Sequence, residues 1–122
     1  MKRRFALIIE DSEDIADFLT IALKMTGFET EIVADGERAL ARLAQIVPDV
    51  VILDLHLPRV MGGEVLSAIR ADPRLAHTQV MIVTADARMA QDLEDQADLV
   101  LIKPVGLEQI RVLAARLTAT DD

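Results

Sequence analysis

Three acidic residues lie at the ends of short apolar segments of the chain. Glu10 and Asp11 follow the run Phe5–Ile9, and Asp54 ends the segment Val50–Asp54. Carboxylates at the carboxyl ends of buried strands lie where open α/β sheets bind their ligands. If the three groups converge within about 5–6 Å, each charged pair repels by roughly 3 kcal/mol at an effective dielectric constant of 20. A hard cation offsets this repulsion and prefers oxygen ligands, so the pattern predicts a Mg²⁺ site.

Two further polar residues follow later apolar runs. Thr84 follows the run Val80–Val83, and Lys103 follows the run Leu99–Ile102. An aspartate can attack a phosphorus centre to form an acyl phosphate, and a metal ion with a lysine would draw charge from the phosphoryl oxygens. We therefore interpret Asp54 as a nucleophile, with Thr84 and Lys103 as groups that hold a phosphoryl group.

Each of these residues also has a simpler interpretation. A single acid at a strand end can be a solvated loop residue, and Lys103 could be only a counter-ion for the acids. Thr84 could be an ordinary β-branched strand residue. Gly62 and Gly63 could allow a sharp turn near Asp54 or simply start a helix. The occurrence of three acids, a hydroxyl and a lysine after four apolar runs favours a site.

Composition limits the class of protein. The 122 residues suit one domain, and an apolar content of 52% argues against disorder. With 21 acids against 13 bases, the net charge of −8 argues against direct nucleic-acid binding. Absence of cysteine excludes disulfides and thiolate metal sites. The basic start, Met1–Arg4, precedes too few apolar residues for a secretory signal, and no apolar run is long enough to span a membrane. We therefore expect a cytoplasmic protein without membrane contact.

Apolar runs alternate with segments of helical period. The residues Ile15, Phe18, Leu19 and Ala22 follow the spacing of one helix face, Gly27 is expected to end that helix, and Asp35 to cap the next one. Strands are predicted at residues 5–9, 29–33, 50–54, 80–83 and 99–102, and helices around residues 15–23, 39–44, 65–69, 89–96 and 107–117. The pattern predicts an α/β protein with a parallel sheet and helices on both faces.

These motifs together resemble the receiver domain of two-component response regulators, over about residues 5–118. The matching motifs are Ile9-Glu-Asp11, Ala34-Asp-Gly-Glu37, Leu53-Asp-Leu-His-Leu-Pro58, Val83-Thr-Ala85 and Lys103-Pro104. The resemblance implies a single receiver domain over residues 1–122. It also implies a flavodoxin-like (βα)5 fold, with five parallel strands in the order 2-1-3-4-5.

The resemblance further implies that Asp54 accepts a phosphoryl group from a sensor histidine kinase or a phosphotransfer protein. Thr84 and Lys103 would bind the phosphoryl oxygens. The groups that would bind Mg²⁺ are Asp11, Asp54, the backbone carbonyl of His56 and, directly or through water, Glu10. Such a protein catalyses its own phosphorylation and dephosphorylation without being a conventional turnover enzyme. It would signal by phosphorylation-dependent docking to a partner, as a monomer or weak dimer.

Several positions depart from the usual receiver pattern. Glu10 stands where aspartate is also frequent, and Val100 stands where an aromatic residue is often found. The segment from Thr84 to Lys103 is about three residues short, so the fourth helix is expected to lose about one turn. His56 and Asp86 are expected to flank the path of water to Asp54 and to tune the lifetime of the acyl phosphate.

Two other functions compete with a phosphorylation switch. A small phosphohydrolase with Asp54 as nucleophile would favour an acid two residues later, where this chain has His56. A degenerate receiver used only for docking would have lost Mg²⁺ binding. Because the chain ends after its fifth helix, we expect either a stand-alone regulator without an output domain or a piece of a longer protein. Partners are expected on the face that carries Val100, Leu101 and Arg111.

Overall fold

The computed structural model of the protein describes residues 4–119. Its strands are β1 (Arg4–Ile9), β2 (Phe28–Val33), β3 (Val50–Leu53), β4 (Gln79–Thr84) and β5 (Leu99–Ile102). Its α-helices are α1 (Glu13–Lys24), α2 (Gly36–Leu43), α3 (Gly62–Ala71), α4 (Ala87–Leu93) and α5 (Leu107–Ala119). Two short 3₁₀ turns, η1 (Pro73–Leu75) and η2 (Glu94–Gln96), follow α3 and α4. The predicted strict alternation of strands and helices is confirmed.

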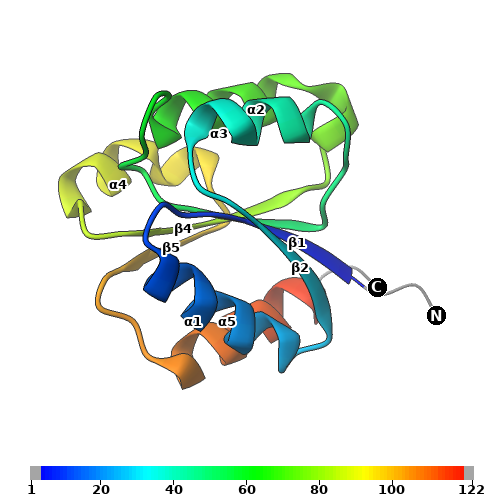
Figure 1. The fold of residues 1–122 in the computed structure, drawn as a ribbon, viewed down its shortest axis with the longest axis vertical. Coiled ribbons are helices and arrows are strands. Elements are labelled where there is room, and N and C mark those ends of the chain that lie inside the picture. Colours follow the sequence, from blue (N-terminus) through cyan, green and yellow to red (C-terminus); the bar gives the residue numbers. More distant parts are fainter. Residues whose placement is uncertain (1–3, 120–122) are drawn as a thin grey trace.

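All five strands pair in parallel, in the order β2-β1-β3-β4-β5. Helices α1 and α5 cover one face of the sheet, and α2, α3 and α4 cover the other (Figure 1). The predicted strand order and two-sided helix cover are therefore confirmed. Because all strands run in the same direction, their carboxyl ends lie along one edge of the sheet.

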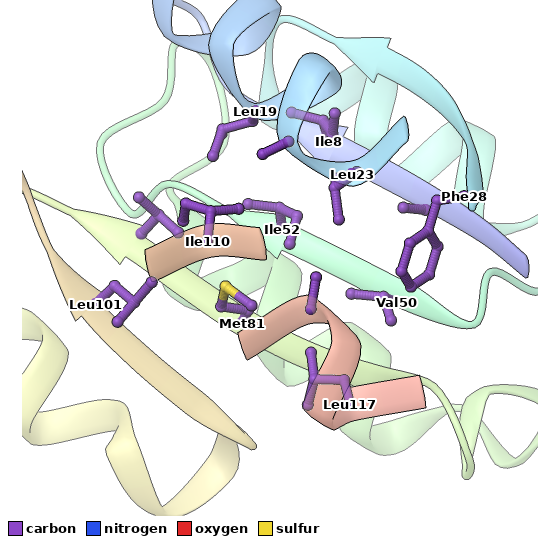
Figure 2. Close-up of a cluster of buried hydrophobic side chains, with 14 of the residues drawn as sticks. Ile8, Leu19, Leu23, Phe28, Val50, Ile52, Met81, Leu101, Ile110 and Leu117 are labelled. Atoms are coloured by element: carbon purple, nitrogen blue, oxygen red, sulfur yellow. The ribbon is translucent and has the colours of Figure 1, made fainter. Parts of the chain in front are cut away.

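Successive residues of each central strand enter two different cores. Ala6 and Ile8 of β1 pack against α1 and α5, in the core that Figure 2 shows, whereas Leu7 and Ile9 pack on the opposite face. All four of these residues are fully buried. Side chains of a strand alternate between its faces, so a strand that is covered on both sides needs an unbroken apolar run. This requirement explains the uninterrupted runs in the sequence.

The same alternation corrects one expectation about the partner face. Leu101 was expected at the surface, but it is 7% exposed and belongs to the core shared by α1 and α5. Val100 is half-buried against the core of the opposite face. The exposed residue of β5 is its last one, Ile102, and Arg111 of α5 is partly exposed. Within β5, Ile102 and not Leu101 is therefore exposed at the surface.

Short polar side chains set the starts of several helices. The Asp35 carboxylate accepts a hydrogen bond from the Arg38 N–H at 2.7 Å, which confirms its predicted capping of α2. Gly27 has a φ of 89°, a conformation that glycine adopts without steric cost, as expected after a helix end. Helix α4 starts before the predicted Met89, because the Asp86 carboxylate accepts from the Met89 N–H at 2.9 Å and caps this helix. It ends at Leu93 and is followed by η2, so the predicted helical segment up to Gln96 is partly 3₁₀.

Candidate functional site

The three acids predicted to converge do meet at the carboxyl edge of the sheet. Glu10 and Asp11 follow β1, and Asp54 follows the neighbouring strand β3. One carboxylate oxygen from each lies within 4.8 Å of the others. Their separation is close enough for one small cation to contact all three groups. Asp11 is exposed, whereas Glu10 and Asp54 are buried, so the cluster opens to solvent on the Asp11 side.

Lys103, which follows β5, supplies the positive charge inside this cluster. Its Nζ lies 2.8 Å from Glu10 Oε1 and 3.2 Å from Asp54 Oδ2. Burial lowers the pKa of the Lys103 amine, but the hydrogen bond to Glu10 and the charge of Asp54 outweigh this and raise it. The lysine therefore stays protonated beside the acids. The Lys103–Pro104 peptide bond is cis.

Glu10 is the most deeply buried acid of the cluster, at 2% exposure. Burial raises the pKa of its carboxyl group, and the nearby charge of Asp54 adds to this effect. Hydrogen bonds from Lys103 and from the Ser12 N–H, the latter at 3.2 Å, offset part of the increase. The pKa of Glu10 is therefore raised mainly because the carboxyl group is buried. Additional positive charge would stabilise its ionised form.

The backbone holds Asp54 firmly at the end of β3. Its N–H donates to the Ile9 carbonyl at 3.0 Å, and its Oδ1 accepts from the His56 N–H at 3.3 Å. A Cβ atom on Gly62 would lie only 2.5 Å from the Asp54 carbonyl oxygen and 2.6 Å from the Leu55 Cα. The backbone of α3 therefore packs directly against the segment that carries Asp54. Gly62 begins this helix, as one interpretation predicted, and it also permits the close approach of the two backbone segments.

Thr84 is fully buried at the end of β4, the strand beside β3. Its hydroxyl accepts a hydrogen bond from the Asp86 N–H at 3.3 Å. Within residues 4–119 this hydroxyl has no hydrogen bond to the acids. Thr84 thus lies on the correct strand for the site but is bonded to the loop that leads into α4.

The side chains of His56 and Asp86 form a bridge that the sequence did not reveal. His56 Nε2 lies 2.6 Å from Asp86 Oδ2, which joins the loop after β3 to the loop after β4. Hydrogen bonds from the Met89 N–H and from His56 lower the pKa of Asp86. The available signal was positional: each residue lies two positions beyond a strand-end site residue, Asp54 or Thr84, on neighbouring strands.

The donor set of the acidic cluster fits a hard divalent cation. All three side chains offer carboxylate oxygens, which Mg²⁺ prefers, and the exposure of Asp11 leaves room for water ligands. The Nε2 atom of the His56 ring is paired with Asp86 and does not belong to the acidic cluster.

Comparison with known proteins gives one consistent result. A family model described as the response regulator receiver domain matches residues 6–115. The DNA-binding response regulator MtrA of Mycobacterium tuberculosis is 34% identical over 121 residues, which are 98% of this chain and 53% of that protein. The regulator RpaA of Synechocystis is 35% identical over 119 residues, 94% of this chain and 49% of its own length. The chain therefore spans about half the length of these curated relatives.

Solved structures agree with the sequence comparison. The chemotaxis response regulator CheY4 of Vibrio cholerae has a TM-score of 0.86 and 27% identity, with 95% of this chain and 99% of that one covered. A response regulator of Chloroflexus aurantiacus has a TM-score of 0.88 and 25% identity, and the match covers 97% of this chain and 99% of that one. Among residues 4–119, no helix has the length and apolar content needed to cross a membrane.

Proposed function

The chain belongs to the family of response regulator receiver domains, and on this premise we propose that Asp54 accepts a phosphoryl group in a Mg²⁺-dependent reaction. One observation supports the proposal above all others. Asp54 is buried at a site where Glu10, Asp11 and Lys103 converge on it from the ends of β1 and β5. Such a site can hold both a cation and a phosphoryl group next to one carboxylate.

Phosphoryl transfer would proceed by attack of one Asp54 carboxylate oxygen on the phosphorus of a donor phosphohistidine. The new P–O bond forms as the P–N bond breaks, and the bonding electrons stay on the imidazole nitrogen, which then takes up a proton. A sensor histidine kinase or a phosphotransfer protein would supply the phosphohistidine. When bound by Glu10, Asp11, Asp54 and the His56 carbonyl, Mg²⁺ would neutralise charge on the phosphoryl oxygens.

Lys103 and Thr84 would respond to the new group. The Lys103 amine already lies 3.2 Å from Asp54 and can transfer its hydrogen bond from the carboxylate to a phosphoryl oxygen. Thr84 can turn its hydroxyl from the Asp86 N–H towards the same group, which would displace the start of α4. Converting a 1:99 equilibrium to 99:1 requires about 5.5 kcal/mol. Two or three charge-assisted hydrogen bonds, at about 1.5–3 kcal/mol each, are sufficient.

We further propose that residues 1–122 form a single receiver domain, with its core at about residues 5–118. Its action would be phosphorylation-dependent docking in the cytoplasm, as a monomer or weak dimer. The net charge of −8 disfavours direct contact between this domain and nucleic acid. The DNA binding named for MtrA is a property of that protein, of which this chain covers about half.

The competing phosphohydrolase function has little support in the geometry. A hydrolase of this type would need an acid near the leaving group, two residues after Asp54. That position holds His56, and its ring is engaged with Asp86. The degenerate-receiver alternative is disfavoured because the three acids still converge.

The proposal is tested by incubating the protein with acetyl phosphate and Mg²⁺ and measuring its intact mass. We expect wild type to gain one phosphoryl group and Asp54→Asn to gain none. Omission of Mg²⁺ should abolish labelling. If Asp54→Asn is labelled as well as wild type, Asp54 is not the acceptor.

A further inference from the structure

A groove of about 660 Å³ is lined by residues of α3 and α4. These two helices lie on the sheet face opposite α1 and α5 (Figure 1). The apolar surface of the groove comes from Met61 just before α3 and from Met89 and Leu93 of α4. Met61 is 39% exposed, and the other two side chains are half-buried. These three residues form an apolar strip at the surface that the phosphorylation site does not use.

Gly63 of α3 lines the groove and brings no side chain into it. Unlike its neighbour Gly62, Gly63 has no steric need to lack a side chain. An added Cβ would have only one neighbour within 4 Å, Leu93 Cδ1 at 3.5 Å, which is an ordinary contact. Gly63 is the second residue of α3, and no steric reason in the surrounding structure requires a glycine at this position. The consequence of this glycine is a deeper groove.

Both charged residues that line the groove are acidic. Glu64 of α3 and Asp92 of α4 are exposed. Within residues 4–119, neither makes an ion pair or a side-chain hydrogen bond. An apolar strip between two unpaired carboxylates is complementary to an apolar side chain flanked by cations.

We propose that the groove between α3 and α4 is a docking site for an amphipathic helix of a partner protein, which inserts a large apolar side chain and places lysine or arginine against Glu64 and Asp92. The net charge of −8 favours a basic partner over a second copy of this chain, because two copies repel each other. The acidic residues also exclude nucleic acid as the occupant. Helix-in-groove recognition uses this combination of an apolar anchor and a polar rim.

The methionines of the chain allow a direct test by NMR. Within residues 4–119, Met61 and Met89 line the groove, Met25 is exposed elsewhere, and Met81 is in the core. The protein would be labelled with ¹³C at the methionine methyl groups and titrated with a synthetic helical peptide that has leucines on one face and lysines beside them. We expect saturable shifts of the Met61 and Met89 methyl signals and none at Met25 or Met81.

A peptide with glutamate in place of each lysine is the charge control, and it should bind at least about ten-fold more weakly. Equal binding of the two peptides would refute the charge argument. The proposal also fails if the Met25 signal shifts instead of the Met61 and Met89 signals. It fails as well if no signal shifts at about 1 mM lysine peptide, because a Kd above about 1 mM is too weak for specific docking. Shifts of Met61 and Met89 with protein concentration alone would identify a second copy as the occupant and overturn the proposal.

Two sets of variants assign the binding to the groove. Gly63→Leu would fill the floor and should weaken peptide binding about ten-fold, whereas Gly63→Ala adds one methyl group and should retain most of it. An unchanged Met81 signal checks that the core is intact. If Gly63→Leu binds the peptide as wild type does, the groove is not the site.

The charge variants decide the matter even if Gly63→Leu fails to fold. Glu64→Gln with Asp92→Asn should weaken binding about five-fold. The matched control, Asp17→Asn with Glu37→Gln, removes the same charge from exposed positions on α1 and α2 and should change binding less than about two-fold. Equal effects of the two double variants would show only general attraction and would refute docking at this groove.

Discussion

His56 Nε2 lies 2.6 Å from Asp86 Oδ2, and this contact joins the loop that follows Asp54 to the loop that follows Thr84. The two side chains are 56% and 29% exposed, so the bridge lies at the solvent boundary of the site. Asp86 also caps α4 through the Met89 N–H. One carboxylate therefore connects the surroundings of the proposed acceptor to the helix whose start the switch would move.

We expect the bridge between His56 and Asp86 to lengthen the lifetime of the phosphorylated state. In His56→Ala with Asp86→Ala, the two loops are no longer joined and water reaches the acyl phosphate more easily. We expect hydrolysis to accelerate about three- to ten-fold, which corresponds to roughly 1 kcal/mol of activation free energy. The measurement is loss of the phosphoryl mass after acetyl phosphate is removed. The control is Glu108→Ala with Arg111→Ala, an exposed pair on α5. Equal rates in the double variant and wild type would exclude the role.

Lys103 is predicted to contribute to stability as well as to chemistry. In Lys103→Met, Glu10 and Asp54 would face each other while 2% and 6% exposed, without their shared cation. Breaking such a partly buried pair should lower the free energy of unfolding by about 1–3 kcal/mol at pH 7. Urea unfolding measures this loss. Adding Asp54→Asn to Lys103→Met should restore part of it, because one of the two repelling charges is gone. A Lys103→Met protein as stable as wild type would contradict this account.

Because the Glu10 carboxyl group is buried, we expect the free energy of unfolding to depend on pH in a specific direction. Its pKa is raised in the folded state, mainly by burial, so the folded protein binds this proton more tightly than the unfolded chain does. The contribution of Glu10 is therefore fully present below pH 4.5, its ordinary pKa, and is lost as the pH rises through the raised value. The free energy of unfolding of wild type minus that of Glu10→Gln should fall across this interval.

Addition of Mg²⁺ should reduce that fall, because a bound cation favours the ionised form of Glu10. Urea unfolding of wild type and Glu10→Gln, at several pH values with and without Mg²⁺, measures both effects. A difference between the two proteins that rises with pH would give the wrong sign and refute the assignment.

Adjacent glycines at the start of α3 should respond in opposite ways to alanine. In Gly62→Ala the new methyl group would meet the Asp54 carbonyl oxygen and the Leu55 Cα at 2.5 and 2.6 Å, so the backbone must shift. We expect a loss of about 1–3 kcal/mol and impaired phosphorylation of Asp54. Gly63→Ala makes only an ordinary contact and should stabilise the protein by up to about 1 kcal/mol. Thermal unfolding of the two variants measures both changes, and equal effects would contradict the packing described for α3.

The pattern of residues alone indicated a parallel sheet covered by helices on both faces, and the resemblance to receiver domains supplied the strand order. Unbroken apolar runs alternating with helical periods require strands that are covered on both faces, which implies a parallel sheet. Parallel strands end at one edge, so residues that directly follow the runs, such as Asp11, Asp54 and Lys103, were expected along that edge. The strand order that brings them together came from the resemblance. Caps such as Asp35 were also predictable, because a cap bonds only to residues a few positions away.

Only the tertiary structure decided the contacts that depend on loop conformation. Lys103 and Glu10 are 93 positions apart, and His56 and Asp86 are 30 apart. Hydrophobic periodicity places such residues on the same edge but does not determine which atoms meet, because loop torsions and side-chain rotamers set those distances. The prediction that Leu101 lies on an exposed face was wrong for a related reason. In a run that is apolar throughout, no polar residue marks which side chains face which layer, so only packing against α1 and α5 reveals it.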